Sequence, residues 1–113
     1  MKARWHAGRE EAARAKVPYG RRSALVLEHG SLEVRYYAPR HGDPQTAHDR
    51  DEVYIVASGR GSFVRGAERI AFAPGAMLFV PAGMEHRFED FSEDFGTWVV
   101  FYGPRGGERE LPF

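Results

Sequence analysis

Hydrophobic and polar residues alternate along most of this chain, beginning at Ser23. The apolar positions recur with a period of two in short runs, and glycine and proline separate the runs. This pattern is typical of half-buried strands. It predicts strands over residues 24–27, 32–37, 53–57, 62–65, 69–72, 77–80, 86–88 and 97–102. In this prediction Pro81-Ala82-Gly83 only interrupts a strand, which continues at His86.

Short strands with close turns, and no helical pattern between them, predict an all-β sandwich or barrel. Barrels and jelly rolls remove sticky sheet edges by closing or doubling the sheet. With 113 residues, the chain is long enough for one domain with a real core. We expect this domain to span residues 23–103, followed by a tail over residues 104–113.

The first 22 residues follow a different pattern and are expected to form a basic arm, residues 1–22. Alanines favour a short helix within residues 3–16, and Pro18 with Gly20 end it. The arm holds seven Lys/Arg against two acids, a net +5, whereas the remainder has nine against fourteen, a net −5. It shows neither an arginine-rich helix face nor an aromatic RNA-binding signature. We therefore expect the arm to lie against its own subunit or a partner subunit, and we expect no nucleic-acid partner.

The composition excludes several kinds of site. The chain has no cysteine, so disulfides, cysteine-ligated zinc and thiol nucleophiles are excluded. Residues 1–22 lack the apolar core of a signal peptide. No apolar run approaches the roughly 20 residues that a membrane span needs. We therefore expect a soluble, cytoplasmic protein without a membrane partner.

The candidate chemistry gathers on two stretches, residues 48–61 and 75–90. If the strand is regular through the preceding loop, Thr46, His48, Glu52 and Tyr54 have the same parity and face the interior. We expect His86 to join them from a neighbouring strand. A carboxylate that opens an apolar strand at an interior position is costly unless it is paired or bound to a metal. Two imidazoles and one carboxylate suit a divalent transition metal such as Zn, Fe, Mn or Ni.

The second stretch also carries a recognisable motif. A glycine is followed after five residues by Pro-x-Gly, after two more by a histidine, and after three more by an acid: Gly75, Pro81, Gly83, His86 and Asp90. This pattern resembles the second motif of the cupins. It differs only at Asp90, where that family has asparagine.

The first stretch resembles the first cupin motif. Thr46-Ala47-His48 is followed after three residues by Glu52, and Glu52 after six residues by Gly59. The pattern departs from the family at Thr46, which stands in the place of the first histidine. The resemblance covers roughly residues 24–102 and is to the small single-domain bacterial cupins. It implies a double-stranded β-helix, the jelly-roll barrel that cupins form.

The resemblance implies that His48, Glu52 and His86 hold the metal, and it leaves two hypotheses about function. The first is a metal-dependent enzyme of dioxygenase, isomerase or lyase type that acts on a small molecule in the barrel pocket. The second is a binding or sensing module without turnover, because a fold alone does not determine function. A metal-free structural barrel is disfavoured, since its buried histidine and glutamate would need other partners.

A fourth position of the metal site is open. Threonine is a poor ligand compared with the histidine that it replaces, so the candidates are Thr46 itself and the amide oxygen of Gln45, with His41 as an outside alternative. Tyr54 is the aromatic side chain that we assign to the pocket. We further expect a homodimer, in which residues 24–37 and the basic arm offer an edge for pairing.

Overall fold

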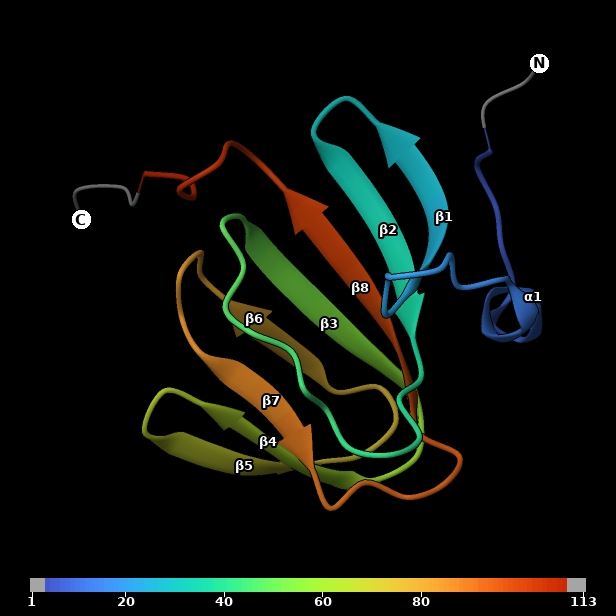
Figure 1. Ribbon diagram of the computed structural model, residues 1–113, viewed down its shortest axis with the longest axis vertical. Helices are drawn as coiled ribbons and strands as arrows, with labels where there is room; N and C mark the ends of the chain where they lie inside the picture. Colours follow the sequence, from blue (N-terminus) through green and yellow to red (C-terminus); the bar gives the residue numbers. More distant parts are fainter. Residues whose placement is uncertain (1–3, 110–113) are drawn as a thin grey trace.

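The computed structural model describes residues 4–109, and strands account for most of the body (Figure 1). Residues 1–3 and 110–113, which the predicted arm and tail include, lie outside the described residues. Each predicted strand is present, and several extend one or two residues further than predicted. The elements are α1 (Arg9–Arg14), β1 (Ala24–His29), β2 (Leu32–Tyr37), β3 (Asp51–Ser58), β4 (Gly61–Arg65), β5 (Glu68–Phe72), β6 (Met77–Val80), β7 (His86–Glu89) and β8 (Gly96–Tyr102).

The strands form two antiparallel sheets that face one another (Figure 1). The larger sheet has the order β1-β2-β8-β3-β6, and the smaller sheet has the order β5-β4-β7. The last strand, β8, lies between β2 and β3 and pairs with both, so Phe101 is opposite Glu33 on one side and Glu52 on the other. This arrangement confirms the predicted all-β jelly-roll barrel.

One prediction about the strands is wrong. We expected the chain after Pro81-Ala82-Gly83 to resume the strand that it interrupts. Instead, β6 belongs to the larger sheet and β7 to the smaller sheet. The Pro-x-Gly turn therefore carries the chain from one sheet to the other. His86 approaches Glu52 from the opposite sheet and not from a neighbouring strand, because β3 is flanked by β8 and β6.

Four phenylalanines pack between the sheets, and we call this cluster the aromatic core: Phe63, Phe72, Phe88 and Phe95. The ring of Phe88 is central, with centroid distances of 4.8 Å to Phe63, 5.5 Å to Phe72 and 4.7 Å to Phe95. Tyr54 meets the same ring edge-on from β3, at 4.9 Å. Tilted and edge-to-face arrangements of this kind are favourable beyond the area that they bury.

The glycine that ends the first motif is required by this packing. Gly59 has a φ of +86°, and a Cβ at this position would lie 2.5 Å from the Cα of Phe95. A side chain would therefore meet both backbone strain and a collision. Gly59 therefore serves the fold.

The first part of the described arm, with α1, lies against the larger sheet beside β2, whereas residues 20–22 reach the cavity described below (Figure 1). Its helix, α1, is shorter than expected and buries Ala12. Residues 4–7 line a small hollow together with side chains of β1, β2 and β8. The strand β1 is an edge strand, and its pairing with a second subunit stays a prediction. No helix within residues 4–109 is long and apolar enough to cross a membrane.

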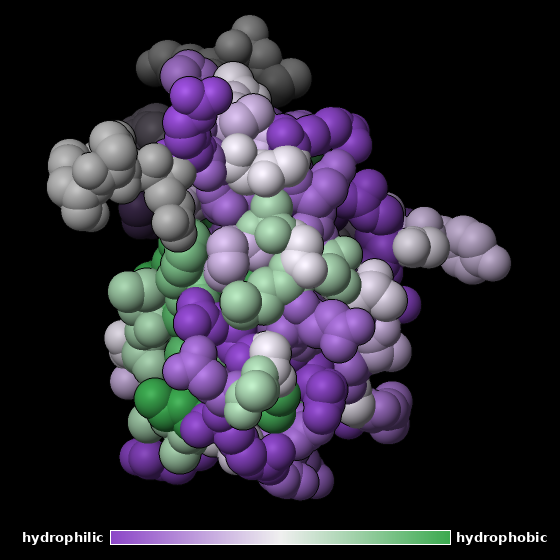
Figure 2. Space-filling view, turned by 90° about the vertical axis from the view of Figure 1, so that its left-hand side faces the viewer, coloured by the Kyte–Doolittle hydropathy of each residue, from purple (hydrophilic) through white to green (hydrophobic). Residues whose placement is uncertain are grey.

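A side view of the molecule shows hydrophobic residues interrupting an otherwise hydrophilic surface (Figure 2). Several large apolar side chains of β3, β5 and β6 are exposed, among them Ile55, Ile70, Met77 and Phe79. They lie together, because Ile55 is opposite Met77 in the larger sheet and Ile70, Met77 and Phe79 line one shallow hollow. The site described next lies elsewhere, between β3, β8 and the loop that precedes β3.

Candidate metal centre

Three side chains of the kinds that bind transition metals meet between the two sheets. Their ligand atoms all lie within 4.8 Å of one another. Glu52 Oε1 is 2.8 Å from His86 Nε2 and 3.8 Å from His48 Nε2. Ligands about 2.1 Å from a shared ion, at tetrahedral or octahedral angles, lie about 3.0–3.4 Å apart. The predicted convergence of these three residues is confirmed. Glu52 and His86 are already close to the spacing of two ligands on one ion, whereas the His48 imidazole, 3.8 Å from Glu52, would have to move closer to share it.

The turn of the second motif holds the loop of the first. His48 lies outside any strand, and the Gly83 N–H donates a hydrogen bond of 2.7 Å to its carbonyl oxygen. The adjacent Ala82 N–H donates to Asp51 Oδ1 at 2.9 Å. Gly83 has a φ of +82°, which glycine adopts readily. His86 follows three residues later, so a single turn positions both imidazoles.

Backbone contact determines which nitrogen of His86 faces the site. The Nδ1 atom is 2.9 Å from the carbonyl oxygen of Met84. Because a carbonyl can only accept, Nδ1 carries the proton, and in the neutral ring Nε2 presents a lone pair. A hydrogen bond of this kind commonly orients the metal-binding histidines of proteins. His86 is therefore ready to ligate through Nε2.

Glu52 gives the clearest indication that a cation belongs here. Its side chain is 1% exposed, and neither carboxylate oxygen has a hydrogen-bond partner among the described residues. The nearest nitrogen, His86 Nε2, is only 2.8 Å away but has no proton to donate in the neutral tautomer. A buried carboxylate facing a lone pair is unfavourable unless a proton or a metal ion lies between them. The residues therefore fit a metal.

The two imidazoles differ in their acid–base behaviour. Burial lowers the pKa of His48, although the charge of Glu52 opposes this change. Burial also acts to lower the pKa of His86, but Glu52 and the Met84 carbonyl outweigh it and raise that pKa above its usual value. The shifts reflect the same competition: the buried carboxylate attracts a positive charge, whether a proton or a metal ion.

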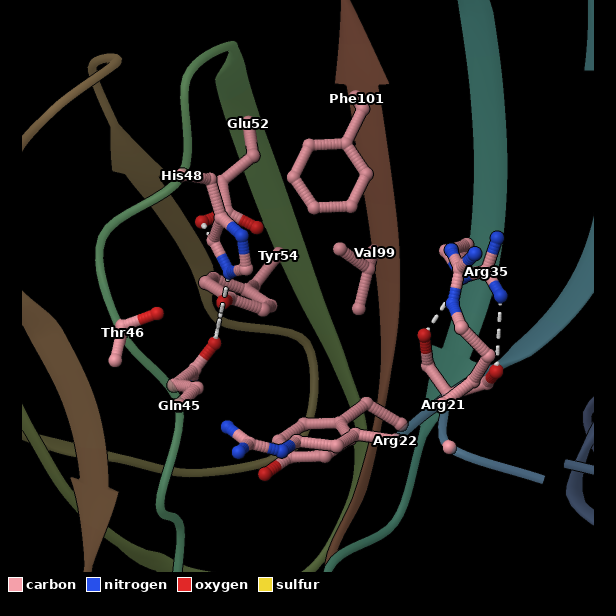
Figure 3. A pocket seen from close by; sticks show the side chains of 13 residues that line it. Arg21, Arg22, Arg35, Gln45, Thr46, His48, Glu52, Tyr54, Val99 and Phe101 are labelled. Carbon is pink, nitrogen blue, oxygen red and sulfur yellow. Dashed lines mark hydrogen bonds and ion pairs between the residues drawn. The ribbon is translucent and has the colours of Figure 1, made fainter. Parts of the chain in front are cut away.

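Gln45 joins this group through its amide oxygen. Its Nε2 donates a 2.6 Å hydrogen bond to Asp43 Oδ2, which turns Oε1 toward the site. Gln45 Oε1 then lies 3.2 Å from His48 Nε2 and 3.1 Å from the hydroxyl of Tyr54 (Figure 3). The structure thus brings the Gln45 oxygen to the edge of the ligand cluster.

Tyr54 reaches the site as the sequence predicts. Its hydroxyl lies 3.0 Å from His86 Nε2 in addition to its contact with Gln45. Burial raises the pKa of Tyr54 well above its usual value, and the charge of Glu52 adds to the rise. The hydroxyl therefore stays protonated and acts as a donor.

The prediction of a regular strand through Thr46 is wrong. The strand β3 begins only at Asp51, and the residues before it form an irregular loop that contains Pro44. Thr46 lines the cavity described below but is exposed, and His48 faces inward because of its bond to the second-motif turn. His41 is exposed and lies outside the cluster of ligand atoms.

Asp43 is a site residue that the sequence analysis missed, because it stands in a loop of proline and glycine without any motif. Its carboxylate accepts hydrogen bonds from the Tyr37 hydroxyl, from Gln45 Nε2 and from the backbone N–H of Phe88. Burial and Asp43 together raise the pKa of Tyr37, so this hydroxyl also stays protonated. Asp43 is thus the anchor that orients Gln45.

A cavity of about 320 Å³ opens from the metal cluster toward the arm. Val99 and Phe101 of β8 form an apolar wall, and three arginines also line the cavity: Arg21, Arg22 and Arg35 (Figure 3). Two of these arginines belong to the residues that we assigned to the arm. The sequence analysis did not link them to the site, because only folding brings the end of the arm beside β8.

The final position of the second motif is structural in this chain. Asp90 has a φ of +51°, the left-handed conformation that aspartate and asparagine tolerate better than most residues. Its carboxylate pairs with Arg69 at the surface, 3.1 Å away. Aspartate in place of the family's asparagine therefore keeps this turn, and its side chain lies away from the metal cluster.

The fold and the His/Glu/His cluster together define a cupin, and comparison with known proteins agrees. The cupin domain family matches residues 33–102, more than half of the chain. The chain belongs to this family. An uncharacterised protein of Streptomyces coelicolor is 41% identical over 80 residues, which cover 69% of this chain and 76% of that protein.

Solved structures show the same fold. A cupin 2 conserved barrel domain protein from Salinispora arenicola has a TM-score of 0.67 and 16% identity, over 91% of each chain. A proposed mannose-6-phosphate isomerase from Ralstonia eutropha has a TM-score of 0.65 and 22% identity, over 89% of this chain and 100% of that one. A DMSP lyase structure has a TM-score of 0.58 and 30% identity, over 68% of this chain and 41% of that one.

Proposed function

We propose that this cupin is a metal-dependent enzyme that converts a small molecule in the cavity beside His48, Glu52 and His86. The observation that carries the proposal is Glu52, a buried carboxylate without a hydrogen-bond partner in the described chain, placed 2.8 Å from an imidazole nitrogen. A divalent ion of Zn, Fe, Mn or Ni would satisfy both groups.

We assign the fourth ligand to Gln45 in preference to Thr46. The amide oxygen of Gln45 is 3.2 Å from His48 Nε2, and Asp43 holds the amide in that orientation. Thr46 is exposed and its hydroxyl forms no hydrogen bond within residues 4–109. An oxygen that is already oriented loses less side-chain freedom when it ligates, which favours Gln45.

The ion, when bound, would supply Lewis acidity toward an oxygen of the substrate. The chain's own residues would then orient that substrate: the apolar wall of Val99 and Phe101 packs against its body, and the protonated hydroxyl of Tyr54 donates to Gln45 Oε1 and so holds that oxygen beside the ligands. Of the dioxygenase, isomerase and lyase classes, the similarity to the DMSP lyase at 30% identity favours a lyase.

Elemental analysis of the protein purified without chelators tests the metal site. We expect about one transition-metal ion per chain, and His86→Ala should lose it while keeping the far-ultraviolet spectrum of the parent. His29→Ala is the matched control, because His29 is exposed and lies outside the cluster. Equal metal content in the parent and in His86→Ala would contradict the assignment, as would a parent that takes up no ion when Zn, Fe, Mn or Ni is added.

A second candidate function is binding or sensing without turnover. It is favoured by the lack of a free general base among the described residues that line the cavity. Glu52 and His48 belong to the metal cluster, and the pKa values of Tyr37 and Tyr54 are both raised. A ligand that binds the metal-loaded protein and is recovered chemically unchanged would support this alternative.

A further inference from the structure

We propose that the small molecule bound by this cupin is an organic carboxylate, and that Arg22 binds its carboxylate group. The inference rests on the proposed function, because it places the remainder of the ligand beside the metal cluster. Arg22 lines the cavity, and its side chain extends across the cavity with the guanidinium on the side of Gln45 (Figure 3).

Arg22 is exposed, and its guanidinium has no partner among residues 4–109. It takes part in none of the ion pairs or side-chain hydrogen bonds formed within residues 4–109. Arg35 lines the same cavity but is already satisfied, because it donates to Ser23 Oγ at 2.7 Å and pairs with Glu33 at 2.5 Å. Arg21 also lines the cavity without an ion pair among residues 4–109, but it lies beside Arg35, whereas the Arg22 guanidinium lies on the side of Gln45 (Figure 3). Arg22 is therefore the arginine that faces an incoming anion beside the metal cluster.

The Asp43 carboxylate contacts two side chains of the cavity lining, Tyr37 and Gln45, and is already hydrogen-bonded, although it keeps its charge. Asp43 accepts its hydrogen bonds from Tyr37, Gln45 and Phe88. The charge of Arg22 acts to lower the pKa of Tyr37, whereas Asp43 raises that pKa. Arg22 therefore lies close enough to influence this end of the cavity electrostatically without being neutralised there by an ion pair.

Charge and shape together define the ligand. A divalent ion held by one ionised carboxylate, Glu52, would retain positive charge, and Arg22 adds a second positive group in the same cavity. Between them Val99 and Phe101 form an apolar wall. A volume of about 320 Å³ is at the lower end of the range for small-molecule pockets. These features fit a compact carboxylic acid with an apolar or aromatic body, since guanidinium and carboxylate form paired hydrogen bonds.

Calorimetry on the full, metal-supplemented chain tests the ligand class. The probes are benzoate and hexanoate, each compared with its neutral amide, and phenyl phosphate as a second kind of anion. We expect at least one carboxylate to bind about tenfold or more tightly than its amide. Equal binding of acid and amide, absence of binding by both acids, or tighter binding by phenyl phosphate would overturn the assignment to carboxylates.

Variants test the role of Arg22. We expect Arg22→Gln to lose about tenfold or more in affinity for the carboxylate, and Arg22→Lys to retain part of it, because lysine keeps the charge but not the paired geometry. Arg60→Gln removes the same charge from an exposed position outside the cavity, and it should bind like the parent. An unchanged affinity in Arg22→Gln, or an equal loss in Arg60→Gln, would overturn the inference.

Metal content measured on the same samples separates the two proposals. Arg22→Gln should carry as much metal as the parent, because Arg22 lies outside the ligand cluster. If the parent binds no metal, the proposed function fails, and the comparison of Arg22→Gln with Arg60→Gln still decides whether Arg22 binds the carboxylate. If the parent binds metal but does not distinguish acid from amide, only the present inference fails.

Discussion

The aromatic core and the metal cluster lie side by side in one barrel, but their side chains are satisfied in opposite ways. In the core, the ring centroid of Phe88 lies 4.7–5.5 Å from rings of the smaller sheet, of the loop before β8 and, through Tyr54, of the larger sheet, so its environment is complete within the chain. In the cluster, Glu52 is equally buried yet has no hydrogen-bond partner among the described residues. The difference teaches that burial alone does not mark a stabilising position. The core contributes stability, whereas the cluster is complete only with something that the chain does not supply.

Tyr54 connects the two regions. Its ring packs against Phe88 with a centroid distance of 4.9 Å. Its hydroxyl, at the other end, reaches His86 Nε2 and Gln45 Oε1. The core thereby fixes the position of a polar group in the site, and the variants below separate the contributions of the two regions.

The largest effect on stability is expected in the aromatic core. Phe88→Ala should lower the free energy of unfolding by about 3–5 kcal/mol, because it removes a buried ring and leaves a cavity among its neighbours. Chemical denaturation of the parent and the variant measures this difference. A loss below about 1 kcal/mol would show that the aromatic core does not depend on Phe88 as the structure implies.

The next largest effect is expected on metal affinity, when Gln45 is replaced. Gln45→Ala is expected to weaken metal binding about ten- to a hundredfold, with little change in stability because the side chain is only half-buried. Thr46→Ala is the matched control and should stay within about twofold of the parent. Competition with a chromogenic chelator measures both. The reverse order, with Thr46→Ala the weaker binder, would transfer the fourth-ligand role to Thr46.

The effect of Glu52 on the stability of the protein should change sign when the metal is removed. At about pH 9, well above the usual histidine pKa, chelator-treated Glu52→Gln should be more stable than the treated parent by about 1 kcal/mol, because a buried unpaired charge is gone. With metal present, the parent should be the more stable protein. Denaturation curves with and without chelator measure this crossover, and a variant that is less stable in both conditions would contradict it.

The smallest effect is expected at the surface. Hydrogen bonds from Arg87 and then Arg69 lower the pKa of Glu89, so its contribution to stability is present above the usual carboxyl pKa and is lost as the pH falls through the lowered value. The group is exposed to solvent, which screens the contribution. Glu89→Gln should therefore melt like the parent at neutral pH and differ, if measurably, only by a shallower loss of stability in acid. A clear drop in melting temperature at neutral pH would contradict this.

The fold could be predicted from the sequence because it depends on local patterns. The alternation along residues 24–102 marks every strand of the structure, and the positions of Gly59 and Gly83 mark two necessary turns. The strand and turn signals lie within a few residues of the features that they predict. The convergence of His48, Glu52 and His86 was predicted through the resemblance to the two cupin motifs, whereas the regular strand through Thr46 and the neighbouring strand for His86 were wrong.

What the sequence determined by itself was therefore the set of strands, the turns and the three candidate ligands. Only the tertiary structure decided which sheet carries His86, how Asp43 orients Gln45, and that Arg22 reaches the cavity. These features depend on contacts between residues far apart in the chain, such as Asp43 with Phe88. Alternation states which face of a strand is buried, but it does not state which distant segment covers that face. That choice is made when the two sheets close on one another.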